Sequence, residues 1–134
     1  MVGASEMRLI EYKVIKINFE LNEKFIFKRE KITIEPFFNR DISKIDDIHY
    51  KIQLGVKISS ELNKSLVPFN TEIIISSIFE LVDWEDSTRN VMAIDNATAI
   101  MFPYLRNLLS TITMNGNIPP YILPIVNVSK LFSK

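Results

Sequence analysis

Residues 96–132, NATAIMFPYLRNLLSTITMNGNIPPYILPIVNVSKLF, decide most of the architecture. Apolar residues recur in the first part at intervals of three and four, which is typical of a helix with one side on a core: Ala97, Ile100, Met101, Tyr104, Leu105, Leu108, Leu109 and Ile112. Asp95 or Asn96 is the expected N-cap, and Gly116 is the expected stop, in the left-handed conformation. Pro103 lies either in the first turn of this helix or inside a longer one.

Charge is almost absent from the predicted helix. Between residues 96 and 114 the charged side chain is Arg106, whereas a surface helix of a small domain normally has a charged outer face. We therefore expect both sides of the helix to be covered, one by the chain's own sheet and the other by a second subunit. The expected contact residues between subunits are Ile100, Met101, Leu105, Leu108, Leu109 and Ile112.

Prolines shape the chain after the helix. Residues 117–120, NIPP, break the helix, and residues 121–128 are apolar and extended, with Pro124 among them. Residues 129–134 are expected to begin a short last helix. The helix is therefore followed by an extended crossing and not by a second long helix.

The region before the helix has the period-two alternation of strands. Residues 48–58 alternate most regularly, with apolar residues on one face and Lys, His and Gln on the other, as expected of an antiparallel strand with one buried face. Residues 8–21 alternate on even positions as far as Val14 and on odd positions from Ile15. This change of phase predicts a β-bulge between these two residues.

Two more extended segments and three connections complete the pattern. Extended chain is expected over residues 24–38, where Pro36 ends it or confines it to a sheet edge, and over residues 66–82. The remaining polar segments are expected to be a connection, a turn and a loop, respectively: residues 39–47, 59–65 and 83–90.

Composition excludes several classes of protein. The 134 residues fit one domain, 1–134, and a hydrophobic content of 47% argues against general disorder. Lys and Arg number 16 and so do Asp and Glu, which argues against a nucleic-acid binder. Cysteine is absent, so disulfides and thiolate metal sites are excluded. Without a signal peptide or a membrane-length apolar run, we expect a cytoplasmic protein that does not insert into a membrane.

Residues that would carry catalysis or hold a metal are few. His49 is the only histidine, and we expect it on the polar face of a strand as a surface residue and not a catalytic base. Glycine is found only at positions 3, 55 and 116, so a phosphate-binding loop is excluded, and no nucleophile motif surrounds any serine. Asp83, Glu85 and Asp86 around Trp84 are expected to form a solvated loop, with a partner-docking patch as the alternative. We expect no enzyme activity, no cofactor and no metal.

The segment quoted first resembles the SecB family of protein-export chaperones. Its MFPYLR, at residues 101–106, is similar to the family's Leu-Phe-Pro-Tyr-Ala-Arg at the start of its long helix. Its GNIPPYILPIVN, at residues 116–127, is similar to the family's Gly-x-Phe-Pro-x-x-x-Leu-x-Pro-Val-Asn. Shorter echoes lie at residues 17–20 and 77–79. The resemblance implies an α+β fold, a four-stranded antiparallel sheet with a long helix and a short C-terminal helix packed on one face.

The resemblance also implies a function. Family members hold unfolded precursor polypeptides in apolar grooves and assemble as dimers of dimers, with the long helices between the sheets. Such grooves bind without sequence specificity, since apolar burial contributes about 25 cal/mol per Å². By the family's arrangement, the groove residues here are Ile32, Ile34, Phe37, Phe38, Tyr104, Tyr121, Ile122, Leu123, Leu131 and Phe132.

Two departures from the family weaken the implied link to the SecA motor, to which many members deliver clients. Typical members are strongly acidic, whereas this chain is neutral, and it ends at Lys134 without a long last helix or a metal-binding tail. Two alternatives to a general export chaperone therefore stay open. One is a SecB-like chaperone dedicated to a single partner, such as an antitoxin or a protein of a mobile element. The other is a small hot-dog-like domain that binds a ligand or acts as an enzyme.

Overall fold

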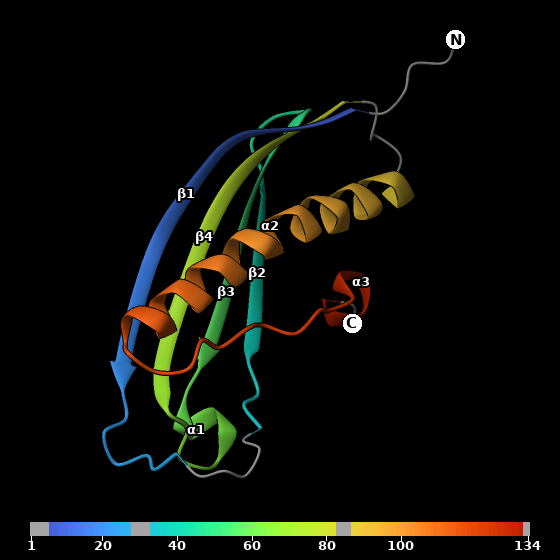
Figure 1. Ribbon diagram of the computed structural model, residues 1–134. Helices are drawn as coiled ribbons and strands as arrows, with labels where there is room; N and C mark the ends of the chain where they lie inside the picture. The colour runs from blue at the N-terminus through green and yellow to red at the C-terminus, as the bar shows by residue number, and fades with distance from the viewer. Residues whose placement is uncertain (1–5, 28–32, 83–86, 133–134) are drawn as a thin grey trace.

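A four-stranded antiparallel sheet carries the long helix on one face (Figure 1). The computed structural model describes residues 6–27, 33–82 and 87–132, without the side chains at 6 and 87–90. The strands are β1 (Glu6–Leu21), β2 (Phe37–Lys44), β3 (His49–Ile58) and β4 (Phe69–Val82), in the spatial order β1-β4-β3-β2. The helices are α1 (Ser60–Asn63), between β3 and β4, α2 (Ser87–Asn115), across the sheet, and α3 (Val128–Leu131), beside β2. The α+β fold class predicted from the sequence is confirmed.

Strand β1 carries two β-bulges against β4. The register shifts between Leu9 and Glu11 and again between Val14 and Lys16, so Ile10 and Ile15 are the extra residues. The predicted bulge between Val14 and Ile15 is therefore confirmed. The bulge at Ile10 was not predicted, because this apolar residue matches the phase of the next positions and hides the shift.

Strand β2 corrects two predictions. Residues 39–47 were expected to be a connection, but β2 pairs with β3 from Phe37 opposite Lys57 to Lys44 opposite Tyr50. Extended chain was expected over residues 24–38, but of the described residues in that range, 24–27 and 33–38, only Phe37 and Phe38 belong to a strand. An edge strand needs less apolar sequence than a central one, since part of it faces water. The polar composition of β2 therefore concealed its strand character.

Helix α2 begins at Ser87, earlier than the N-cap expected at Asp95 or Asn96. The polar residues at its start hid the helical period, and the loop expected over residues 83–90 is helix from Ser87 onward. Pro103 therefore lies inside a longer helix, which is one of the two predicted alternatives. The acidic cluster around Trp84 lies outside the described residues.

The end of α2 at Asn115 agrees with the prediction, but Gly116 acts for a different reason. The left-handed residue is Asn117, with φ 59°, and Gly116 does not have a positive φ. A Cβ atom at Gly116 would lie 3.0 Å from two ring carbons of Phe19, closer than real Cβ atoms normally approach. Glycine at this position therefore permits close packing of the helix end on β1, and the expected left-handed glycine is wrong.

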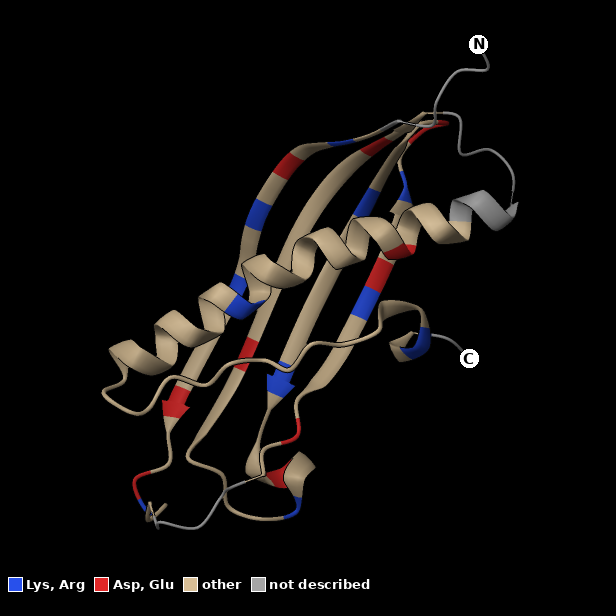
Figure 2. Ribbon diagram, turned by 45° about the vertical axis from the view of Figure 1, so that its right-hand side comes forward, with Lys and Arg blue, Asp and Glu red and all other residues tan. Residues whose placement is uncertain are grey.

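The hydrophobic core lies between α2 and the inner face of the sheet. Ala97, Met101, Leu105 and Leu109 have no exposed surface, and they pack with the buried side chains of β3 and β4. Met101, Leu105 and Leu109 were predicted to contact a second subunit. This prediction is wrong for these three side chains, because the subunit's own core encloses them. Figure 2 shows how few charged residues α2 carries on its described length.

Candidate functional site

Helix α2 has two flanks that contact different parts of the chain. With 3.6 residues per turn, Ile100, Tyr104 and Leu108 share the flank toward β1. The ring of Tyr104 stacks on that of Tyr12 in β1, with centroids 4.8 Å apart. Arg106, Ser110 and Thr113 share the opposite flank, where the chain returns after the helix.

Residues 119–127, here called the crossing segment, are fastened to α2 through their backbone. The Nε–H of Arg106 donates to the carbonyl oxygen of Leu123 at 3.3 Å, and the Ser110 hydroxyl donates to that of Tyr121 at 3.2 Å. The backbone N–H of Tyr121 donates to Thr113 Oγ1 at 2.9 Å. These bonds hold an extended chain without regular secondary structure at a fixed position on the helix.

Alternation along the crossing segment sends neighbouring side chains in opposite directions. Leu123 is 2% exposed and belongs to the core, whereas Ile122 is 65% and Ile125 92% exposed. The prediction that Leu123 lines a groove is therefore wrong. Ile125 was not predicted as a site residue, and alternation gives no signal for it, because two residues after the buried Leu123 it would be expected to point inward.

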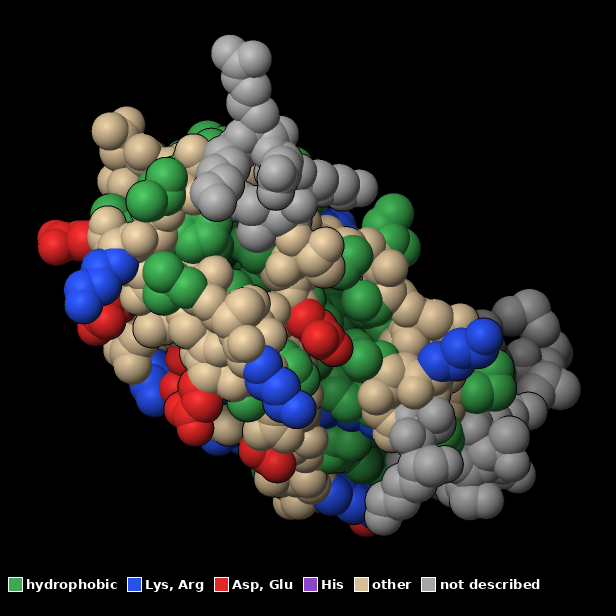
Figure 3. All heavy atoms as spheres, turned by 90° about the horizontal axis from the view of Figure 1, so that it is seen from below, with side chains coloured by type: hydrophobic (Ala, Val, Ile, Leu, Met, Phe, Trp, Pro, Cys, Tyr) green, Lys and Arg blue, Asp and Glu red, His purple; other side chains and the backbone are tan. Residues whose placement is uncertain are grey.

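Six apolar side chains from the crossing segment, the β2 region and the C-terminal residues are here called the crossing strip: Ile34, Phe38, Tyr121, Ile122, Leu131 and Phe132. Four of them are partly buried against the core, whereas Ile122 and Leu131 are exposed. The Phe38 ring packs edge-on against Phe102 of α2, with centroids 5.2 Å apart. The Tyr121 hydroxyl donates to the carbonyl oxygen of Ile34 at 3.5 Å. Burial raises the pKa of Tyr121, so it remains a neutral donor at physiological pH. Hydrophobic side chains reach the surface on the side of the molecule that Figure 3 shows.

Three other predicted groove residues have different outcomes. Phe37 pairs with Lys57, whose side chain faces away from the helices, so it points to the sheet face opposite Phe38. Tyr104 lies on the β1 flank of α2, away from the crossing segment. The structure therefore does not place Phe37 and Tyr104 beside the crossing segment, where the groove was expected. Ile32 lies outside the described residues.

A second apolar surface, here called the β1 surface, extends along the edge strand and the adjoining flank of α2. Its members are exposed or half-buried: Ile10, Val14, Ile15, Ile17, Leu21, Ile100, Tyr104 and Leu108. Ile100 and Leu108 were predicted as subunit contacts and lie here. Ile112, also predicted, is partly buried against the core. Burial, and secondarily the neighbouring Tyr104, raises the pKa of Tyr12 above its ordinary value.

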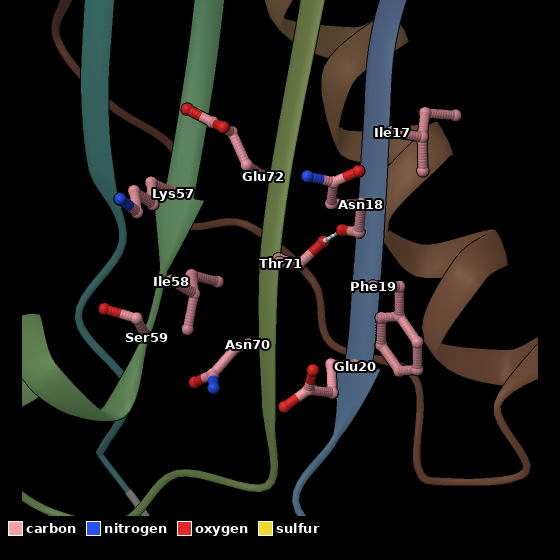
Figure 4. A pocket seen from close by; sticks show the side chains of 10 residues that line it. All are labelled: Ile17, Asn18, Phe19, Glu20, Lys57, Ile58, Ser59, Asn70, Thr71 and Glu72. Carbon is pink, nitrogen blue, oxygen red and sulfur yellow. Dashed lines mark hydrogen bonds between the residues drawn. The ribbon is translucent and has the colours of Figure 1, made fainter.

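The outer face of the sheet is polar and balanced in charge. Arg8 pairs with Glu80 at 3.1 Å, and Lys16 pairs with Glu72, whose pKa this hydrogen bond lowers. A shallow hollow of about 580 Å³ lies at the end of this face, and Thr71 bonds there to the Asn18 backbone (Figure 4). Within the described ranges, no three His, Cys, Asp or Glu side chains are close enough to hold a metal.

His49 is more closely engaged than its predicted role as a plain surface residue. Its Nδ1 lies 2.8 Å from both carboxylate oxygens of Asp46, and its Nε2 lies 3.4 Å from Glu80. The Asp46 carboxylate also accepts the backbone N–H groups of Ile48 and His49. The first of these bonds, then the contact with His49, lowers the pKa of Asp46. These contacts close the turn between β2 and β3, so the role of the cluster is structural.

The sheet, the long helix and the crossing segment fastened to it agree with the fold that the resemblance to SecB-like chaperones implied. The chain belongs to the SecB family: the model of that family, described as preprotein translocase subunit SecB, matches residues 6–134. This result favours a SecB-like protein over the hot-dog-like alternative. Of the helices in the described part of the chain, none is both long and apolar enough to cross a membrane.

Relatives of several kinds resemble the chain. It is 29% identical to the protein-export protein SecB of Saccharophagus degradans, over 70% of this chain and 56% of that protein. It is 33% identical to an uncharacterised protein of Methanocaldococcus jannaschii, over 95% of this chain and 83% of that protein. Among solved structures, a SecB-like chaperone of Mycobacterium tuberculosis, in complex with a ChAD peptide from the HigA1 antitoxin, has a TM-score of 0.68 at 13% identity. The alignment covers 90% of each chain, and this likeness concerns the fold.

Proposed function

We propose that this protein is a holding chaperone, not an enzyme, that binds unfolded polypeptides along the crossing strip. The observation that carries the proposal is the group of partly exposed apolar side chains of the crossing strip, beside a crossing segment that hydrogen bonds from α2 hold in place. Exposed apolar patches on soluble proteins commonly mark binding sites. Family membership supports the same conclusion.

The binding mode follows from the chemistry of the strip. Each apolar side chain of a client that leaves water contributes about 25 cal/mol per Å² of buried area. Several such contacts give useful affinity without a fixed sequence. An extended client also forms main-chain hydrogen bonds with unpaired backbone groups at an open strand edge. Clients with spaced apolar residues are therefore the expected ligands.

We propose further that subunits associate through the β1 surface, in a dimer of dimers that works in the cytoplasm. Ile15 is 51% exposed and Ile10 46%, on an edge strand whose outer backbone groups have no strand beside them in the described chain. Such an edge is stable in water only when it is covered or guarded. The uncharged flank of α2 extends the same surface.

One pair of measurements tests both parts. Purified protein is expected to suppress aggregation of an unrelated, chemically unfolded protein at near-equimolar subunit ratios. Light scattering after size-exclusion chromatography is expected to give a multiple of the subunit mass of 15.5 kDa. A monomer at micromolar concentration would contradict the assembly, and unhindered aggregation would contradict the holding activity.

A chaperone dedicated to one partner is the second candidate, and the outer face of the sheet favours it. In the family, an acidic face contributes to docking on SecA, whereas here Arg8 and Lys16 neutralise Glu80 and Glu72. A basic partner would therefore gain little from long-range attraction to this face. Undetectable binding to SecA, together with failure to suppress the aggregation of unrelated unfolded proteins, would support this candidate over a general export chaperone.

A further inference from the structure

Helix α3 depends on its surroundings for order. It has four residues, and an isolated helix of this length is not stable in water. Its N-cap Asn127 accepts the backbone N–H of Lys130 at 3.2 Å, and Val128 is its buried side chain. These two contacts are a small interface. The position of Phe132, which follows the helix and belongs to the crossing strip, therefore depends on other groups.

Arg40 lies directly under this end of the chain. It projects from the inner face of β2, where its partner in β3 is the buried Leu54. Its side chain is 12% exposed, which is unusual for an arginine. The guanidinium carbon lies 4.5 Å from the centre of the Phe132 ring, in a cation–π contact.

Two acceptors on α2 fix the orientation of this guanidinium. Its Nη1 donates to Asp95 Oδ1 at 2.8 Å and to Thr98 Oγ1 at 3.1 Å. The Thr98 hydroxyl itself donates to the carbonyl oxygen of Ile94 at 2.7 Å. The Thr98 oxygen therefore still has a lone pair that accepts from Arg40. Arg40, Thr98 and Asp95 thus satisfy one another's hydrogen bonds among largely apolar neighbours.

We propose that Arg40 is a positioning residue that fastens α3 to the rest of the subunit and thereby holds Phe132 in the crossing strip. A single side chain from β2 joins the first half of α2, through Asp95, to the last described residue of the chain. The Phe132 ring then stays in one position while its exposed part contacts a client. This inference rests on the proposed function where it concerns client affinity, and on the geometry alone where it concerns α3.

The decisive variant combines Arg40→Met with Asp95→Ala. Replacing a buried ion pair by apolar residues is often neutral for stability, so this variant is expected to fold. The double variant no longer has the Arg40 guanidinium beneath the Phe132 ring. We expect protection of the Leu131 and Phe132 amides against hydrogen exchange to fall about tenfold. The fluorine resonance of 4-fluorophenylalanine at position 132 is expected to move toward its position in unfolded chain.

Client affinity provides the second readout. The dissociation constant for a permanently unfolded model polypeptide is expected to rise about threefold to tenfold in the double variant, as a contact of cation–π strength is lost. The matched control is Arg8→Met, which removes another arginine ion pair, with Glu80, on the opposite sheet face. The control is expected to leave α3 protection, the fluorine resonance and client affinity unchanged.

The outcomes are separable. If the double variant keeps wild-type protection and resonance at position 132, the role of Arg40 is refuted, whatever its client affinity. If these signals change but client affinity does not, the link from α3 to the crossing strip is refuted. If wild-type protein binds no unfolded polypeptide, the proposed function fails, while the exchange and fluorine measurements still decide whether Arg40 holds α3.

Discussion

The two edge strands of the sheet differ in what they expose. β1 is 16 residues long, and five of its large apolar side chains are more than 40% exposed. β2 is 8 residues long, and its exposed large apolar side chain is Ile42. The inner face of β2 is also partly covered by α3 through Arg40 and Phe132.

This difference indicates two kinds of contact. A long apolar edge that continues onto the uncharged flank of a helix suits permanent association, because its exposure in a free subunit would favour aggregation. A short, polar edge beside a fixed apolar strip suits clients that bind and leave. We therefore assign subunit association to the β1 side and client binding to the β2 side, and the following predictions test that assignment.

The largest effect is expected when a charge is introduced on β1. Ile17→Lys places an ammonium on the β1 surface, where the native side chain is 41% exposed. Because an unpaired charge in an interface costs several kcal/mol, the dissociation constant between subunits is expected to rise about a hundredfold or more. Analytical ultracentrifugation across a concentration series measures this change.

The matched control for that prediction is Ile42→Lys. Ile42 is 45% exposed and points to the same sheet face from the other edge strand. It is expected to leave association unchanged. Equal loss of association in both variants would remove the distinction between the edges.

The next effect is expected from Phe38 and its neighbour Phe37, which face opposite sides of β2. Phe38→Ala removes an apolar side chain from the crossing strip, and client affinity is expected to fall about tenfold. Phe37→Ala is expected to leave client affinity unchanged. Fluorescence anisotropy with a labelled unfolded polypeptide measures both, and circular dichroism checks the fold. If Phe37→Ala lowers client affinity and Phe38→Ala does not, the client binds the opposite face of the sheet and the proposal is contradicted.

A smaller effect concerns how α2 is fastened to β1. Gly116→Ala introduces a Cβ atom 3.0 Å from the Phe19 ring, so the free energy of unfolding is expected to fall by about 1 to 2 kcal/mol. The control is Gly55→Ala, whose Cβ would meet Ile74 at an ordinary 3.5 Å. Urea unfolding of both variants measures the difference. A stabilised Gly116→Ala would show that helix propensity outweighs this contact.

The smallest effect concerns acid stability at the turn that fastens β2 to β3. The folded-state pKa of Asp46 is lowered, so its ionised form contributes stability above its ordinary pKa, and this is lost as pH falls through the folded value. Asp46→Asn is expected to unfold at slightly lower urea concentration at pH 7 and to lose less stability on acidification below about pH 4. If the variant and the wild type show the same dependence of stability on pH, the ionisation of Asp46 does not contribute to folding.

Prediction from sequence succeeded where the signal is local. The period of residues 48–58 gave β3, and the change of phase at Val14 and Ile15 gave a true bulge. It failed where polar residues take part in regular structure, as in β2 and in the first turns of α2. Among the residues predicted for the groove, Phe37 and Tyr104 lie on other surfaces and Leu123 lies in the core, because these positions depend on which distant segment packs opposite each side chain. Client binding by Ile34, Phe38, Tyr121 and Phe132 stays a prediction.

What the sequence alone determined is the set of elements with a strong apolar period and the nearly uncharged long helix. Only the tertiary structure decided which side of that helix faces the core, the crossing segment or β1. The physical reason is that Met101 and Tyr104 both fit the helical period of large side chains, and their exposure depends on which distant strand lies opposite each. The contact of Arg40 with Asp95 and Phe132 likewise joins three segments that no local pattern relates.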